Sequence, residues 1–145
     1  LILLKKLNAC HGFFWGMASS PYLGGGFGHF YAYAPEKFEY PINRFAMEVK
    51  RQLDVLDKNL SSRQYLCGDT YNISDLAVHA WYGTLMLRNI YDSAVFLDVA
   101  SYKNLDRWAK EIAERPAYKR GSRVGRMPTD KDNAILERHD ASDLD

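Results

Sequence analysis

The 145-residue sequence has little cysteine, no long apolar run and almost no net charge. The two cysteines, Cys10 and Cys67, are too far apart for a Cys-x-x-Cys redox or zinc pair. So few cysteines favour a reducing compartment, which makes the cytoplasm the expected location. The longest aliphatic run, residues 1–4, is far shorter than the roughly 20 residues of a membrane helix. The sequence therefore predicts neither a membrane-spanning helix nor a disulfide scaffold.

Motifs for metals and for nucleotide phosphates are also missing. The four histidines have no zinc-site spacing, and no His-Glu-x-x-His is present; they are His11, His29, His79 and His139. The glycines at positions 24, 25, 26 and 28 do not complete Gly-x-Gly-x-x-Gly, because position 29 is histidine. We therefore expect no metal and no dinucleotide cofactor.

The net charge of +1 is assembled from unequal parts. Residues 103–126 carry eight basic and three acidic side chains, whereas residues 129–145 carry six acidic and two basic ones. The basic stretch is compatible with a nucleic-acid footprint, but no nucleic-acid motif accompanies it. We favour a solvated helix face that the acidic tail covers, and expect neither a nucleic-acid nor a membrane partner.

What the sequence does have is helical periodicity. Apolar residues spaced three and four apart predict a helix over residues 2–19, with Leu7, Phe14 and Met17 on its core face and Pro21 ending it. A loop with four glycines is expected over residues 23–35. The most regular pattern predicts a long amphipathic helix over residues 36–60.

Two further helices complete the expected fold. Asn72 and Asp75 have the types and spacing of an N-capping box, and they open a helix to about Arg88 that is apolar on nearly all faces and is expected to be buried. Another helix runs from Ser101 until Pro116 stops it. Because no segment alternates strictly, we predict an all-α bundle of about five helices and no sheet.

The order of these pieces resembles the C-terminal helical domain of cytosolic glutathione transferases. The resemblance rests on Gly-Asp-Thr-Tyr-Asn-Ile-Ser-Asp at residues 68–75 and Glu-Arg-Pro-Ala at residues 114–117, and it covers residues 1–121. Segments 21–31, 40–48 and 137–143 are further similar to the Nu class, which acts as glutathione-dependent disulfide-bond reductases.

The resemblance implies a function for a longer protein. It implies that the 145 residues are a fragment, that an N-terminal thioredoxin-like domain with the catalytic residues is absent from them, and that the isolated chain is inactive. It also implies glutathione as cosubstrate, a small disulfide or electrophile as substrate, and a homodimer. Residues 122–145 are expected to wrap the surface as an extension. The alternative is a stand-alone helical module that docks a protein partner without catalysis.

The resemblance also suggests site residues. Arg44 lies one residue before Phe45, about 100° away from the core-facing line of its helix, and it matches a glutathione-binding arginine of the class. The alternative for Arg44 is a surface ion pair with Glu48. Met17 stands where the class commonly has a glutamine that contacts glutathione, and core packing is the other interpretation. Aromatic residues expected to line a substrate pocket include Tyr22, Phe27 and Tyr31, for which packing within the domain is the alternative.

Overall fold

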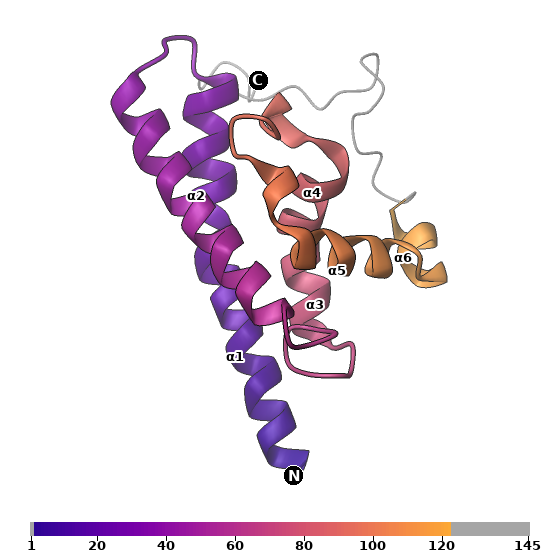
Figure 1. The fold of residues 1–145 in the computed structure, drawn as a ribbon. Helices are drawn as coiled ribbons and strands as arrows, with labels where there is room; N and C mark the ends of the chain where they lie inside the picture. The colour runs from indigo at the N-terminus through magenta and orange to yellow at the C-terminus, as the bar shows by residue number, and fades with distance from the viewer. Residues whose placement is uncertain (1, 123–145) are drawn as a thin grey trace, which may run out of the picture. The chain divides into compact units, whose positions relative to one another are not determined.

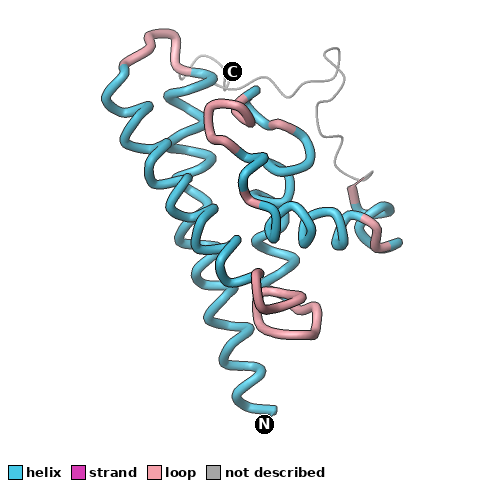
Figure 2. The backbone as a smooth tube through the Cα atoms, viewed as in Figure 1, coloured by secondary structure: helices cyan, strands magenta, loops and turns pink. Residues whose placement is uncertain are grey.

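The computed structural model describes residues 2–122, and all regular elements within that range are helical (Figures 1 and 2). The all-α prediction is therefore confirmed for the described part of the chain. The chain divides into two compact units, Leu1–Ile112 and Ala113–Asp145.

The first helical rod does not end at Pro21. Helix α1 (Ile2–Pro21) continues directly into the π-helix η1 (Tyr22–Tyr33), so the loop expected over residues 23–35 is wrong for most of its length. Pro21 is tolerated because the wider π turn begins immediately after it, where the hydrogen-bond pattern of the α-helix already changes. The glycines make this helix possible by letting neighbouring side chains come close to its backbone.

The apolar stripe of α1 faces outward, contrary to expectation. Leu7, Phe14 and Met17 are 57%, 68% and 56% exposed within this chain. The side of α1 that packs instead carries small residues. A Cβ added at Gly12 would lie 2.8 Å from Ser74 Oγ, and one at Gly16 would lie 2.8 Å from Val78 Cγ2, in the helix that begins at Ile73.

Helix α2 (Glu39–Leu60) runs back from the end of η1 (Figure 1). Its bounds agree with the predicted helix over residues 36–60, apart from the first turn. The inward face matches the predicted apolar line over Val49, Leu53, Leu56 and Leu60. Phe38, by contrast, occupies the N-cap position just before the helix, and its side chain is 56% exposed.

The third helical rod is built from α3 (Ile73–Val78), η2 (His79–Gly83) and α4 (Thr84–Arg88), and it ends at a left-handed Asn89. Its start shows the predicted capping box: Asn72 Oδ1 accepts from the Ser74 N–H at 2.9 Å, and Asp75 Oδ2 accepts from the Asn72 N–H at 3.0 Å. The prediction that nearly all faces are buried is wrong, because Ile73 and Leu76 are more than half exposed.

Helix α5 (Lys103–Ala113) closes the first unit after the 3₁₀ turns η3 (Ile90–Asp92) and η4 (Val99–Ser101). Leu105, Trp108, Ala109 and Ile112 are buried on the face that the sequence predicted. The cap of α5 comes from another helix. Asp57 Oδ1 of α2 accepts from the backbone N–H groups of Asn104 and Leu105 at 2.8 and 2.9 Å.

The second unit is described over a short stretch only. It contains α6 (Pro116–Gly121), with Pro116 in the first helical turn. Lys119 and Glu114 form an ion pair within this unit. The expected extension over residues 122–145 lies outside the described residues, apart from Ser122.

Candidate functional site

The candidate site lies where η1 packs against the first half of α2. A Cβ on Gly26 would overlap the ring of Phe45, so only glycine allows this approach. Phe45 stacks on Phe30 with ring centroids 5.6 Å apart, and Tyr22 lies at 6.3 Å on a tilted plane. These contacts fix the α2 backbone at Phe45. They therefore also fix the starting point of the neighbouring side chain, Arg44.

Arg44 is exposed and has no ion pair among the described residues. The expected alternative partner, Glu48, is instead bound by Arg51 through a 2.5 Å contact between Nη2 and Oε1. Gln52 Nε2 also donates to Glu48 Oε1 at 3.1 Å. The hydrogen bond from Arg51 is the main cause that lowers the pKa of Glu48, and Arg44 contributes only a weaker longer-range attraction. The guanidinium of Arg44 is thus available to an anion from outside the described chain.

Met17 and Tyr22 are the other exposed members of the expected site. Met17 lies on the outward face of α1, so the core-packing interpretation is wrong for this chain on its own. Tyr22 is 43% exposed beside Phe45, which places its ring close to the helix turn that carries Arg44. A thioether does not donate hydrogen bonds, whereas the tyrosine hydroxyl donates and accepts.

Phe27 and Tyr31 belong to a second aromatic cluster. Phe27 has no exposed surface and stacks on Tyr31 at 4.8 Å and on Phe96 at 6.0 Å. Tyr91 adds an edge contact at 6.4 Å. Phe27 therefore serves as core packing here and offers no face to a ligand, while Tyr31 is half-buried.

The polar core beside the site was not visible in the sequence. Gln52 of α2 is buried, and its Oε1 accepts from the Tyr82 hydroxyl at 2.7 Å. Burial strongly raises the pKa of Tyr82, so the phenol stays protonated and donates. Burial also lowers the pKa of His79, whose Nε2 lies 3.0 Å from the Ala109 carbonyl oxygen. These contacts join α2, η2 and α5. They give the helix that carries Arg44 a fixed support.

Other chemistry is not indicated in the described part of the chain. No group of three metal-ligating side chains occurs among the described residues. Cys10 is exposed and Cys67 is half-buried, and both are free thiols. None of the helices described is long and apolar enough to cross a bilayer.

Comparison with known proteins identifies the family of the chain and several similar proteins. The family model for the glutathione S-transferase C-terminal domain matches residues 22–116. A curated relative, the disulfide-bond oxidoreductase YghU of Escherichia coli (strain K12), is 52% identical over 143 residues, which are 99% of this chain and 50% of that protein. The chain spans about half the length of the curated relatives it matches.

Solved structures agree with the sequence comparison. The glutathione transferase YghU from Streptococcus pneumoniae, complexed with glutathione, superposes with a TM-score of 0.82 at 54% identity, over 85% of this chain and 48% of that one. A glutathione transferase from Pseudomonas putida, with one glutathione disulfide bound per subunit, superposes with a TM-score of 0.74 at 27% identity, over 83% of this chain and 52% of that one.

Proposed function

The chain belongs to the glutathione S-transferase C-terminal domain family, and we propose that it forms the helical half of a glutathione-dependent disulfide-bond oxidoreductase in which Arg44 binds a carboxylate of glutathione. The observation that carries the proposal is the exposed guanidinium of Arg44, without an ion pair among the described residues, on a helix fixed by the Phe45 stack. A planar guanidinium donates two parallel N–H bonds to a carboxylate, which fixes the ligand's orientation as well as its charge.

Orientation is what this half would supply to thiol–disulfide exchange. In that reaction a glutathione thiolate attacks one sulfur of a disulfide, a mixed disulfide forms, and the other sulfur leaves as a thiolate that takes up a proton. A second glutathione resolves the mixed disulfide and gives glutathione disulfide. Arg44 holds the bound tripeptide by a carboxylate, so that its sulfur starts from a defined position. Cys10 and Cys67 are not nucleophiles in this scheme.

Tyr22 and Met17 complete the glutathione-facing surface that we propose. Tyr22 is exposed beside Phe45, and its hydroxyl is a donor near the turn that carries Arg44. Met17 offers only apolar contact, because its thioether replaces the donor that the Nu class commonly has there. We propose that Tyr31, which is half-buried, lines the substrate pocket, and that the buried Phe27 holds its ring in place by stacking on it.

Exposed apolar faces support a larger assembly. Leu7, Phe14 and Met17 on α1 and Ile73 and Leu76 on α3 are all more than half exposed in this chain. We assign these faces to contacts with a thioredoxin-like half and with a second copy in a homodimer, so that the isolated chain is inactive. The two free cysteines are in keeping with a cytoplasmic protein.

Kinetics of an Arg44→Ala variant of the complete protein test the proposal. We expect the apparent KM for glutathione to rise about tenfold, the effect of losing about 1.4 kcal/mol of charge-assisted binding, with a smaller change in kcat. Arg44→Lys keeps the charge but not the planar guanidinium. Its apparent KM for glutathione should therefore lie between that of the unchanged protein and that of Arg44→Ala. Lys58→Ala, which removes an exposed cation at the far end of α2, is the matched control. An unchanged glutathione dependence in Arg44→Ala would contradict the assignment.

A further inference from the structure

Helix α2 carries three charged side chains on successive turns, Arg44, Glu48 and Arg51. Residues three and four apart are neighbours on a helix surface, so Glu48 is within reach of both arginines. It pairs with only one of them. Arg51 Nη2 lies 2.5 Å from Glu48 Oε1, whereas Arg44 forms no ion pair among the described residues. The partner that Glu48 takes therefore determines whether the guanidinium of Arg44 is free.

Arg51 binds both oxygens of the Glu48 carboxylate. Its Nε lies 3.2 Å from Oε1 and 3.1 Å from Oε2, in addition to the contact between Nη2 and Oε1. A guanidinium that meets both oxygens fixes the orientation of a carboxylate as well as its position. The Glu48 side chain is only 15% exposed, so water and salt screen this pair less than a fully exposed one.

A second donor holds Glu48 from the core. Gln52 Nε2 donates to Glu48 Oε1 at 3.1 Å, and the buried Tyr82 hydroxyl donates to Gln52 Oε1 at 2.7 Å. Because the amide oxygen of Gln52 accepts from Tyr82, its NH₂ group is the end that faces Glu48. Arg51 and Gln52 both follow Glu48 in the helix, whereas Arg44 lies one turn before it. The carboxylate is therefore bound on the side opposite to Arg44 along the chain.

We propose that Arg51 is a positioning residue for glutathione: by binding Glu48 it keeps that carboxylate from pairing with Arg44, and so leaves Arg44 free for the ligand. This inference rests on the proposed function of Arg44. Among the positions three or four residues from Glu48, only 44 and 51 carry a cation. Without Arg51, Glu48 is left with Arg44 as its partner, and a carboxylate of glutathione must then displace it.

The size of the effect follows from this competition. An ion pair one helical turn apart at a partly shielded site is formed in about two thirds to four fifths of the molecules. The apparent dissociation constant of a ligand equals the intrinsic one divided by the fraction of protein that is free to bind. Loss of Arg51 should therefore weaken glutathione binding about three- to fivefold, which is less than the roughly tenfold effect expected for the loss of Arg44 itself.

A double-mutant cycle in the complete protein tests the proposal. We expect Arg51→Ala to raise the apparent KM for glutathione about three- to fivefold with little change in kcat. In a Glu48→Gln background the same change should leave KM unaltered, because no carboxylate is left to reach Arg44. A simple loss of positive charge would instead raise KM by the same factor in both backgrounds. Arg51→Lys should recover most of the affinity, since lysine also pairs with Glu48.

Two further variants serve as controls. Lys58→Ala removes an exposed ion pair with Asp54 on the same helix and should leave KM unchanged. Arg51 is 57% exposed, so Arg51→Ala should remain folded, which circular dichroism checks. If Arg44→Ala does not raise KM, the proposed function fails and the role of Arg51 with it. If Arg44→Ala raises KM but Arg51→Ala has no effect, or the same effect with and without Glu48, only the role of Arg51 is wrong.

Discussion

At the scale of single residues, one carboxylate connects three segments of the first unit. Asp75 is fully buried. Its Oδ1 accepts from the Leu66 N–H and from Trp108 Nε1, each at 2.9 Å, and its Oδ2 accepts from the Asn72 N–H. A buried carboxylate is tolerated when hydrogen-bond donors replace its lost hydration, and here every donor comes from a different part of the chain. Asp75 is therefore structural, although a buried acid near a pocket resembles a catalytic group.

Replacing this carboxylate by an amide tests that role. Asp75→Asn keeps the size but turns an NH₂ group toward N–H donors, so we expect the free energy of unfolding to fall by about 3 kcal/mol. Asp106→Asn is the control, because Asp106 pairs with Lys110 at a half-exposed site and should change stability by less than about 1 kcal/mol. Urea denaturation of both variants gives the comparison. Equal losses would mean that Asp75 does not hold the three segments together.

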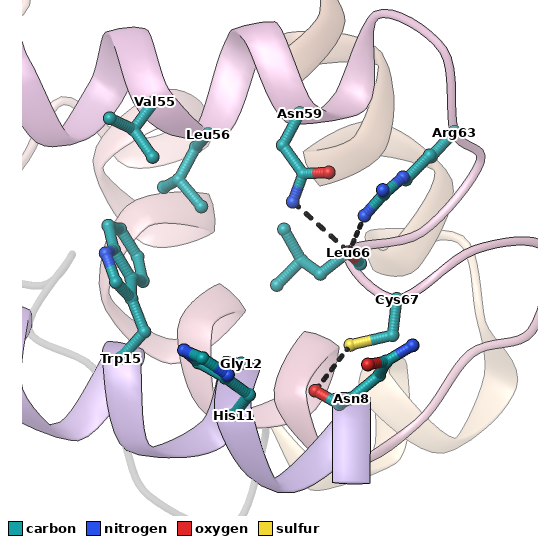
Figure 3. A pocket seen from close by; sticks show the side chains of 10 residues that line it. All are labelled: Asn8, His11, Gly12, Trp15, Val55, Leu56, Asn59, Arg63, Leu66 and Cys67. Carbon is teal, nitrogen blue, oxygen red and sulfur yellow. Dashed lines mark hydrogen bonds between the residues drawn. The ribbon is translucent and has the colours of Figure 1, made fainter. Parts of the chain in front are cut away.

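The position of Arg44 could be predicted from sequence because it depends on a local rule. Along α2 the apolar period is long and regular, so a residue next to a core position lies at the edge of the core. Met17 shows the limit of that rule, since a period identifies an apolar face but not what covers it. The pocket between α1 and the end of α2 (Figure 3) was missed for another reason. Trp15, Leu56 and Arg63 come from three segments, and no sequence pattern links them.

At the scale of elements, the packing of α1 on α3 depends on missing side chains. Gly12 and Gly16 are one helical turn apart and meet Ser74 and Val78, which are also four residues apart. Removing Cβ atoms lets the two backbones come close, so that Ser74 Oγ donates to the Ala9 carbonyl at 2.6 Å across the contact. This contact buries the glycine side of α1 and leaves the apolar stripe outside.

Gly16→Ala tests this contact. Alanine favours a helix over glycine by about 1 kcal/mol, but the new methyl group would overlap Val78, which is buried and stiff at χ1. We expect a net loss of about 1–2 kcal/mol in the free energy of unfolding. Val78→Ala should remove the overlap, so that the double variant is more stable than the sum of the single changes predicts.

Gly25→Ala is the matched control for that experiment. A Cβ at Gly25 meets nothing within 4 Å, so the alanine should be neutral or stabilise the helix by up to about 1 kcal/mol. If Gly16→Ala behaves like Gly25→Ala in thermal and urea unfolding, close approach of α1 to α3 is not what holds the pair.

Elements with a strong local signal could be predicted, and those shaped by tertiary contacts could not. Helices α2 and α5 match their apolar periods to within a few residues. The glycine-rich segment of η1 was expected to be a loop because glycine disfavours helices, yet contacts such as Gly26 with Phe45 make a helix there favourable. The cap of α5 was invisible for the same reason, since Asp57 lies more than 40 residues earlier in the chain.

At the scale of the whole molecule, the exposed apolar faces of α1 and α3 indicate that another part of a protein covers them. A protein rarely leaves a continuous row of large apolar side chains in water, and Leu7, Phe14 and Met17 form such a row on α1. The chain spans about half the length of its curated relatives, and under the proposed function the other half of such a protein covers this row. An interaction module would use the same face for a partner. In a longer transferase the segment that covers α1 belongs to the same protein, whereas in an interaction module it belongs to a different one.

Stability measurements on Phe14 separate these possibilities. Phe14 is 68% exposed in this chain, so Phe14→Ser should cost the isolated chain less than about 0.5 kcal/mol in the free energy of unfolding. In the complete protein the same change should cost about 2 kcal/mol, because the ring is then buried against the other half. Val95→Ser, at a side chain 95% exposed, should have a small effect in both forms. Urea unfolding of the two forms makes the comparison, and an equally small cost of Phe14→Ser in both would show that nothing within the complete protein covers α1.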